Sequence, residues 1–255
     1  MRKFSLVCTL AVLASPAFAN PVDLNATYVV NLSGVNVATV RVHFTDDGET
    51  YDLNLDASVS GVGEVVAQGV AEVDSSGDSS SGVLLSHDFD LMTEANGERF
   101  SVDVRYANGN ATAFVVDPPL RDVVARVPVE RSHLNQVNDA IAPFVVKAAS
   151  LETVCDRSMQ VFTGVERFDM RLRFAAVQQA TSPRTGYQGP VALCSLRYTP
   201  ISGHFETSEI TRYLADSDRI HLWYAPAEGT EYFIPYRVLM GTQIGDLSMV
   251  LTQLN

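Results

Sequence analysis

Long stretches in which apolar and polar residues alternate constrain this chain more than any other feature. In residues 51–60, apolar side chains fill the odd positions, from Tyr51 to Val59, and Asp, Asn or Ser fill the even ones. The stretch Phe168–Phe174 repeats the pattern, with apolar residues at even positions and charged residues at odd positions. Successive side chains of a strand point to opposite faces of a sheet, so each stretch predicts a strand with one buried and one solvated face. This alternation is typical of antiparallel sheets.

Similar stretches occur along most of the chain and are separated by turn sequences such as Asp46-Asp47-Gly48 and Asn96-Gly97. We predict further strands near residues 28–32, 39–44, 64–73, 83–91, 99–106, 111–116, 159–165, 190–199, 219–225, 231–240 and 246–254. No linker or repeat of fixed period interrupts them, so we expect a single domain over residues 20–255. The apolar faces of so many strands need an apolar partner to cover them.

Residues 139–149 are the one segment with a convincing helical pattern. Apolar residues recur there at i, i+3, i+4 and i+7, namely Ile141, Phe144, Val145 and Ala148. Asn138 or Asp139 is suited to cap such a helix, and Pro143 fits only in its first turn. We therefore expect a mainly β fold, with long antiparallel strands forming a curved open barrel or β-spiral around this one short helix.

The first 19 residues have the pattern of a secretory signal peptide. Arg2 and Lys3 precede an apolar run from Phe4 to Leu13, and Ala17-Phe18-Ala19 is a cleavage sequence. The apolar run is too short to span a bilayer. We expect a cleaved export signal and a mature protein that is not membrane-spanning and is located in the bacterial periplasm.

Removal of the signal peptide would take Cys8 with it and leave the pair Cys155 and Cys194. An even number of cysteines in an oxidising compartment predicts a disulfide between them. Closing that loop would stabilise the fold by about 4 kcal/mol in the chain-entropy view of disulfides.

The charge and the motifs exclude several classes of function. The net charge is −12, and an acidic surface of this kind repels phosphate backbones, which argues against a nucleic-acid partner. None of the five histidines has metal-ligand spacing, and no GxSxG nucleophile motif is present. We therefore predict no metal site, no cofactor, no catalytic residues and no enzymatic activity.

The apolar face of the predicted sheet is larger than one short helix can cover, so we expect an apolar groove. An acyl chain or an apolar peptide segment would dock there, beside Phe144. We expect this face to include Leu53, Leu55, Phe100, Val102, Phe144, Phe168, Met170 and Leu172. A fully packed core, with recognition at an outer edge around Trp223 and Arg237, is the rival interpretation.

Eighteen positions between Cys155 and Gly245 form a recognisable set: Cys155, Phe162, Gly164, Arg167, Asp169, Cys194, Tyr198, Pro200, Ile201, Gly203, Trp223, Ala225, Pro226, Pro235, Arg237, Gly241, Thr242 and Gly245. As a set they resemble a bacterial periplasmic family of domains of unknown function. The resemblance implies an open β-spiral or half-barrel, similar in outline to the LolA and LolB lipoprotein carriers and to the EipB envelope-integrity protein. It implies no catalytic residues.

From these observations we expect a non-enzymatic periplasmic protein that supports cell-envelope integrity. It would bind a lipid, a lipidated chain or a protein partner in an apolar concave face. The alternatives are an enzyme acting on an envelope glycan or lipid, and a purely structural periplasmic scaffold. An outer-membrane barrel shares the strand pattern but is disfavoured by the predicted inner helix and disulfide.

Overall fold

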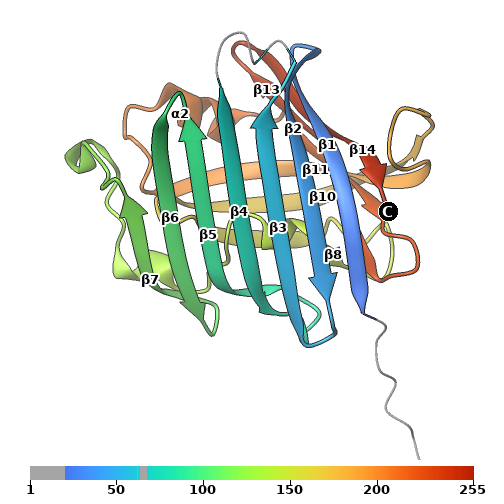
Figure 1. Cartoon of the computed structure of the whole chain (residues 1–255), viewed down its shortest axis with the longest axis horizontal. Helices are drawn as coiled ribbons and strands as arrows, with labels where there is room; N and C mark the ends of the chain where they lie inside the picture. The colour runs from blue at the N-terminus through green and yellow to red at the C-terminus, as the bar shows by residue number, and fades with distance from the viewer. Residues whose placement is uncertain (1–20, 62, 64–67) are drawn as a thin grey trace, which may run out of the picture.

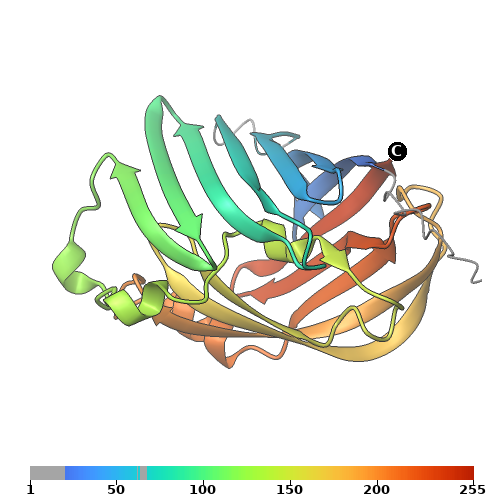
Figure 2. The ribbon, with the colours of Figure 1, turned by 90° about the horizontal axis from the view of Figure 1, so that it is seen from below.

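The computed structural model describes residues 21–61, 63 and 68–255, and most of its strands pair with their neighbours in sequence. The sheet order is β7-β6-β5-β4-β3-β2-β1-β14-β13-β12-β11-β10-β9, and β8 pairs with β13. The sheet curls into a nearly closed antiparallel barrel, with the first and last strands side by side in its middle (Figures 1 and 2). The mainly β, curved-barrel prediction is therefore confirmed. The predicted signal peptide, residues 1–19, and residues 64–67 of the strand predicted near 64–73 lie outside the described residues.

The strands are β1 (Val22–Leu32), β2 (Val35–Asp46), β3 (Thr50–Val59), β4 (Gly69–Asp78), β5 (Leu85–Ala95), β6 (Glu98–Ala107), β7 (Asn110–Asp117), β8 (Val146–Lys147), β9 (Arg157–Phe162), β10 (Arg167–Ala180), β11 (Gly189–Ser202), β12 (Ile220–Pro226), β13 (Tyr232–Thr242) and β14 (Gly245–Leu254). The helical elements are the 3-10 turns η1 (Val123–Ala125), η2 (Arg131–Leu134) and η3 (Ala142–Phe144), and the α-helix α2 (Glu209–Asp216).

The helix predicted over residues 139–149 is wrong. The buried carboxylate of Asp139 accepts hydrogen bonds from the backbone N–H groups of Ile141 (2.7 Å) and Ala142 (2.8 Å), which closes a tight turn. A single 3-10 turn follows, and the chain then extends as β8, where Val146 and Lys147 pair with β13. The apolar residues read as a helical stripe therefore lie on a turn and a short strand.

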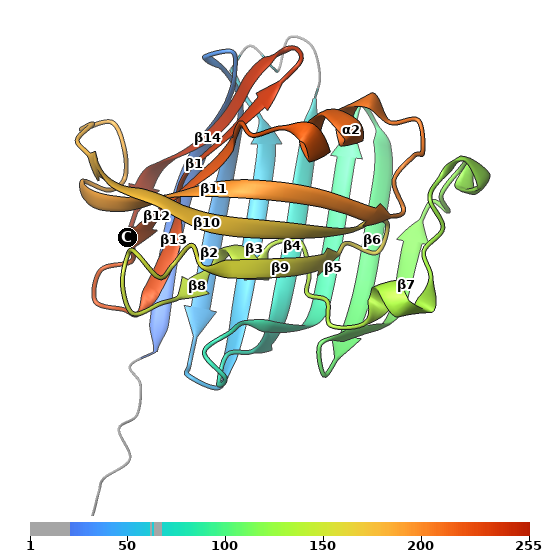
Figure 3. The same cartoon turned by 180° about the vertical axis from the view of Figure 1, so that it is seen from behind.

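The α-helix of the described residues is α2, and it does not lie inside the sheet. Its first turn is capped by the Ser208 hydroxyl, which accepts a hydrogen bond from the backbone of Thr211. It packs beside β11, beyond the four residues of β11 that pair with β12 (Figure 3). Leu214 of α2 packs against the core beneath β11.

Residues 137–147, which we call the strap, cross the barrel interior (Figure 2). At one end, Asn138 bonds to the edge strand β9: its N–H donates to the Gln160 carbonyl (2.8 Å), and its carbonyl accepts from the Phe162 N–H (2.9 Å). At the other end, β8 pairs with Tyr232 and Phe233 of β13. The strap thus joins the free edge of the sheet to its centre and occupies the place expected for the inner helix.

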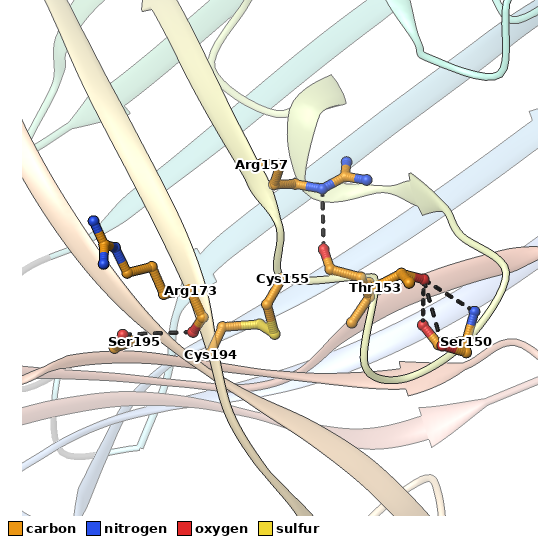
Figure 4. Close-up of a disulfide and its surroundings, with 8 residues drawn as sticks. Ser150, Thr153, Cys155, Arg157, Arg173, Cys194 and Ser195 are labelled. Carbon is orange, nitrogen blue, oxygen red and sulfur yellow. Dashed lines mark hydrogen bonds between the residues drawn. A yellow bond between two sulfur atoms is a disulfide. The ribbon is translucent and has the colours of Figure 1, made fainter.

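The disulfide between Cys155 and Cys194 is present, with 5.5 Å between the Cα atoms (Figure 4). Both cysteines are fully buried in a core cluster that also holds Met170, Leu172 and Leu222. The bond ties the segment after the strap to the inner face of β11. This prediction is confirmed.

Candidate functional site

An apolar cavity of about 250 Å³ lies between the strap and the sheet. The first three strands supply one wall, the strap a second, and β13 and β14 the third. The lining includes Leu24, Tyr28, Val42, Leu55, Ile141, Phe144, Val145, Val238 and Met249. The lining residues carry no charged group, so the cavity suits an apolar ligand.

Three of the predicted lining residues, Leu53, Leu55 and Phe144, do line this cavity. The cavity lining also includes residues that were not predicted, such as Tyr28, Val42 and Met249. The alternation in β1, β2 and β14 already marked these side chains as facing one side. The sequence did not indicate which inward faces the strap would cover and which it would leave open.

The remaining predicted lining residues do not lie on this cavity, and three of them, Val102, Met170 and Leu172, lie in packed core. Met170 and Leu172 belong to the disulfide cluster, with 7% and 1% of their surfaces exposed. Val102, 1% exposed, packs in a separate cluster with Phe162, and Phe100 lies at the margin of that cluster. Phe168 also packs against the disulfide cluster. Other segments cover Met170, Leu172 and Val102. Phe100 and Phe168 are only partly buried, and Phe100 lines a separate pocket together with Pro118 and Arg121.

Trp223 and Arg237 lie together on the outer face of the sheet. Trp223 alternates with buried Leu222 and Tyr224 on β12 and pairs across the strands with Arg237 on β13. The Arg237 guanidinium lies 5.2 Å from the centre of the Trp223 ring, and the Trp223 indole N–H donates to Gln178 (2.8 Å). Trp223 and Arg237, the residues of the predicted outer recognition edge, are therefore in contact, and they face away from the apolar cavity.

A buried polar network holds the strap against β3, β4 and β5. The Asp139 carboxylate, fully buried, accepts hydrogen bonds from the hydroxyls of Ser75 and Ser86 as well as from the strap backbone. The Tyr51 hydroxyl joins the same two serines at 3.0 and 3.1 Å. Burial raises the pKa of Asp139, although each of these hydrogen bonds acts to lower it. The strap position is thus specified by a carboxyl group that is costly to ionise.

A second polar cluster anchors the far end of the strap. The Lys147 ammonium lies 3.1 Å from the Asp46 carboxylate, which also accepts hydrogen bonds from the hydroxyls of Tyr232 (2.6 Å) and Ser79. Burial acts to raise the pKa of Asp46, but these partners and the Gly48 N–H outweigh it, so the pKa is lowered. Asp46 is therefore ionised and pairs with Lys147 at neutral pH.

A second cavity, of about 620 Å³, lies on the other side of the strap. Its lining is more polar and includes Asn138, Lys147, Arg157, Ser158 and Gln160. Val145 belongs to the lining of both cavities, so the strap forms a thin partition between them.

The chain matches the family described as "Protein of unknown function (DUF3108)" over residues 27–252. The chain belongs to the DUF3108 family. The DUF3108 match begins in β1 and ends in β14, so it includes the strap, the disulfide and all the residues that line the two cavities except Leu24 and Ala26. No curated protein and no solved structure matches the chain.

Two further features of this DUF3108 protein concern metal ligands and membrane-spanning helices. Within residues 21–61, 63 and 68–255, no group of three or more His, Cys, Asp or Glu side chains is placed to hold a metal ion. In the same part of the chain, no helix has the length and apolar character needed to cross a bilayer.

Proposed function

We propose that this DUF3108 protein is a non-enzymatic periplasmic binding protein that holds an apolar chain in the barrel and supports cell-envelope integrity. The observation that carries the proposal is the apolar cavity between the strap and the sheet. The envelope role is supported only by analogy, because the fold implied by the family resemblance is similar in outline to the LolA and LolB carriers and to the EipB protein.

The chemistry of the lining favours an acyl chain or an apolar peptide segment as the occupant. Among the lining residues, the Tyr28 hydroxyl is the only side-chain polar group. Transfer of apolar surface from water into such a site is favourable, by roughly 0.8 kcal/mol for each buried CH₂ group. A volume of about 250 Å³ is just below the usual range for ligand pockets, roughly 300–1,000 Å³. We therefore expect one short chain or the end of a longer one.

Asp139 is the strongest candidate for acid–base chemistry, and its surroundings favour a structural role. Its carboxylate is fully buried and is absent from the lining of both cavities. All four of its hydrogen-bond donors come from the strap backbone and from Ser75 and Ser86. A general acid or base must come within hydrogen-bond reach of its substrate, so this group is better suited to holding the strap.

Analysis of co-purifying molecules would test the proposal. The protein is released from cells by osmotic shock, purified without detergent, extracted with organic solvent and analysed by mass spectrometry. We expect release with the periplasmic fraction, a mature N-terminus at Asn20 and an acyl-containing molecule in the extract. Retention in the cytoplasm would contradict the periplasmic location. An extract without any such molecule, together with no binding of added apolar probes, would leave the scaffold role.

A further inference from the structure

Arg157 is a cationic side chain that points into the barrel. On β9 it pairs with Leu172 of β10, whose side chain is buried in the inner core. The next residue, Ser158, is exposed, and Met159 is buried again in the same core. Since side chains alternate along a strand, Arg157 lies on the inner face with Met159.

Among the residues that the structure describes, none provides a carboxylate within ion-pair distance of the Arg157 guanidinium. Its Nε donates a hydrogen bond to the Val154 carbonyl at 3.0 Å. The ion pairs of the described residues do not include Arg157, and Asp156, which lines the same cavity, forms none with it. Burial lowers the pKa of Arg157, which indicates that its charge is poorly solvated. By contrast, Lys147 in the same lining is neutralised by Asp46 at 3.1 Å.

Among the described residues, one further buried polar group without a hydrogen-bond partner lies in the same interior as Arg157. The Tyr224 hydroxyl is fully buried and has no hydrogen-bond partner. Tyr224 belongs to the same core cluster as Met159 and Leu172, the inward-facing residues next to Arg157 along β9 and across from it on β10. An unpaired charge and an unsatisfied hydroxyl in one interior are costly unless a ligand satisfies them.

The two cavities therefore differ in a complementary way. One is apolar and uncharged, and the other contains the Arg157 guanidinium, for which the described residues provide no carboxylate partner. They are adjacent across Val145. A guanidinium binds carboxylate and phosphate groups through two parallel hydrogen bonds.

We infer that the ligand is an anionic amphiphile, whose carboxylate or phosphate head binds Arg157 while its chain enters the apolar cavity past Val145. This inference rests on the proposed function, because it specifies the ligand of the same interior. The carboxylate and phosphate forms share one chemistry at Arg157, and their relative affinities would distinguish them.

The test compares three probes that share a ten-carbon chain: decanoate, decyl phosphate and decanol. Each is titrated calorimetrically into the mature protein, its Arg157→Gln variant and an Arg171→Gln control. Arg171 lies on the neighbouring strand opposite Ser158, exposed on the outer face, so its loss removes the same charge from outside the barrel. We expect Arg157→Gln to weaken the anionic probes by about tenfold and to leave decanol unchanged. Arg171→Gln should leave all three unchanged.

Each other outcome has a distinct meaning. Equal binding of all probes to the wild type, with no effect of Arg157→Gln, would overturn the head-group inference and leave the apolar site standing. Equal weakening by Arg157→Gln and Arg171→Gln would also overturn it, since it would reveal only long-range attraction. If decanol and the anionic probes all fail to bind, the proposed function itself fails. Should Arg157→Gln not fold, Arg157→Lys, which keeps the charge, must bind decanoate better than decanol for the inference to stand.

Discussion

The carboxylate of Asp139 on the strap accepts a hydrogen bond from the hydroxyl of Ser86 on β5, 53 residues earlier in the chain. The same oxygen also accepts from Ser75 on β4. Hydrogen bonds across so many residues fix the strap inside the barrel, because an unmade bond to a buried carboxyl group is expensive. The apolar cavity exists because the strap is held at this position.

Asp139→Asn should alter the pH dependence of stability. The pKa of Asp139 is raised in the folded protein above its ordinary value of 3.8, so the folded state holds the proton more tightly. Below that value both states are protonated and the carboxyl group carries no penalty. As pH rises above it, the wild type loses stability up to the raised folded pKa, while an asparagine does not. Nearby Tyr51 and Tyr106 stay neutral over this range, since burial raises the pKa of each.

Urea unfolding at several pH values between 3 and 8 would measure this effect. We expect the unfolding free energy of Asp139→Asn, relative to the wild type, to increase with pH. An exposed carboxylate on the outer face of β3, changed as Asp52→Asn, is the control and should give no such trend. A constant difference between Asp139→Asn and the wild type would show that this carboxyl group is not costly to ionise.

The disulfide should be complete in the mature protein. Alkylation of unreduced, denatured protein is expected to label no cysteine. Paired replacement of Cys155 and Cys194 by serine should lower the free energy of unfolding by about 4 kcal/mol, given their separation of 39 residues. Labelling of two cysteines in the unreduced protein would contradict the bond and weaken the case for export.

Phe144 should contribute less to stability than a fully buried residue elsewhere in the cavity lining, such as Leu53. It is partly buried and already faces the cavity, so Phe144→Ala removes contacts on only part of its surface. We expect a loss of roughly 1–3 kcal/mol. Leu53→Ala, at a position 2% exposed, should cost roughly 2–5 kcal/mol. Chemical denaturation of both variants tests the order, and an equal loss would place Phe144 in filled core.

Much of the barrel could be predicted because alternation is a local signal. The stretches around Leu53 and Met170 alternate, and Leu53, Met170 and Leu172 are buried as the pattern indicates. Phe174, at the end of the second stretch, is 40% exposed next to a shift in the strand register. The disulfide followed from counting cysteines. The prediction of a helix over residues 139–149 was wrong because apolar residues spaced three and four apart also suit a turn whose two sides both face the protein interior. At Asp139, the competing backbone turn prevailed.

The cavity itself could not be predicted, because it depends on which long-range partners cover each inward face. Leu172 and Leu55 have the same pattern in sequence. Leu172 is covered through the disulfide segment, whereas Leu55 faces the open space beneath the strap. The inward position of Arg157 had only a weak signal in the sequence. Arg157 is two residues before the apolar Met159, so the two side chains share one face of the strand, and Met159 is buried in the structure.

Two substitutions to larger side chains should separate open space from filled core. Val42 lines the cavity and is half-buried, so Val42→Phe can place its ring in free volume with little loss of stability. Val102 is 1% exposed, and the backbone of Gly164 packs directly against it. Val102→Trp should therefore overpack the core and cost roughly 1–3 kcal/mol or more. Thermal unfolding of the two variants measures the difference.

Calorimetric titration of decanol into the wild type and into Val42→Phe tests the apolar ligand site most directly. We expect saturable binding of one molecule to the wild type, and at least tenfold weaker binding to a folded Val42→Phe variant. No saturable binding to the wild type, or equal binding to both proteins, would contradict a ligand site between the strap and the sheet.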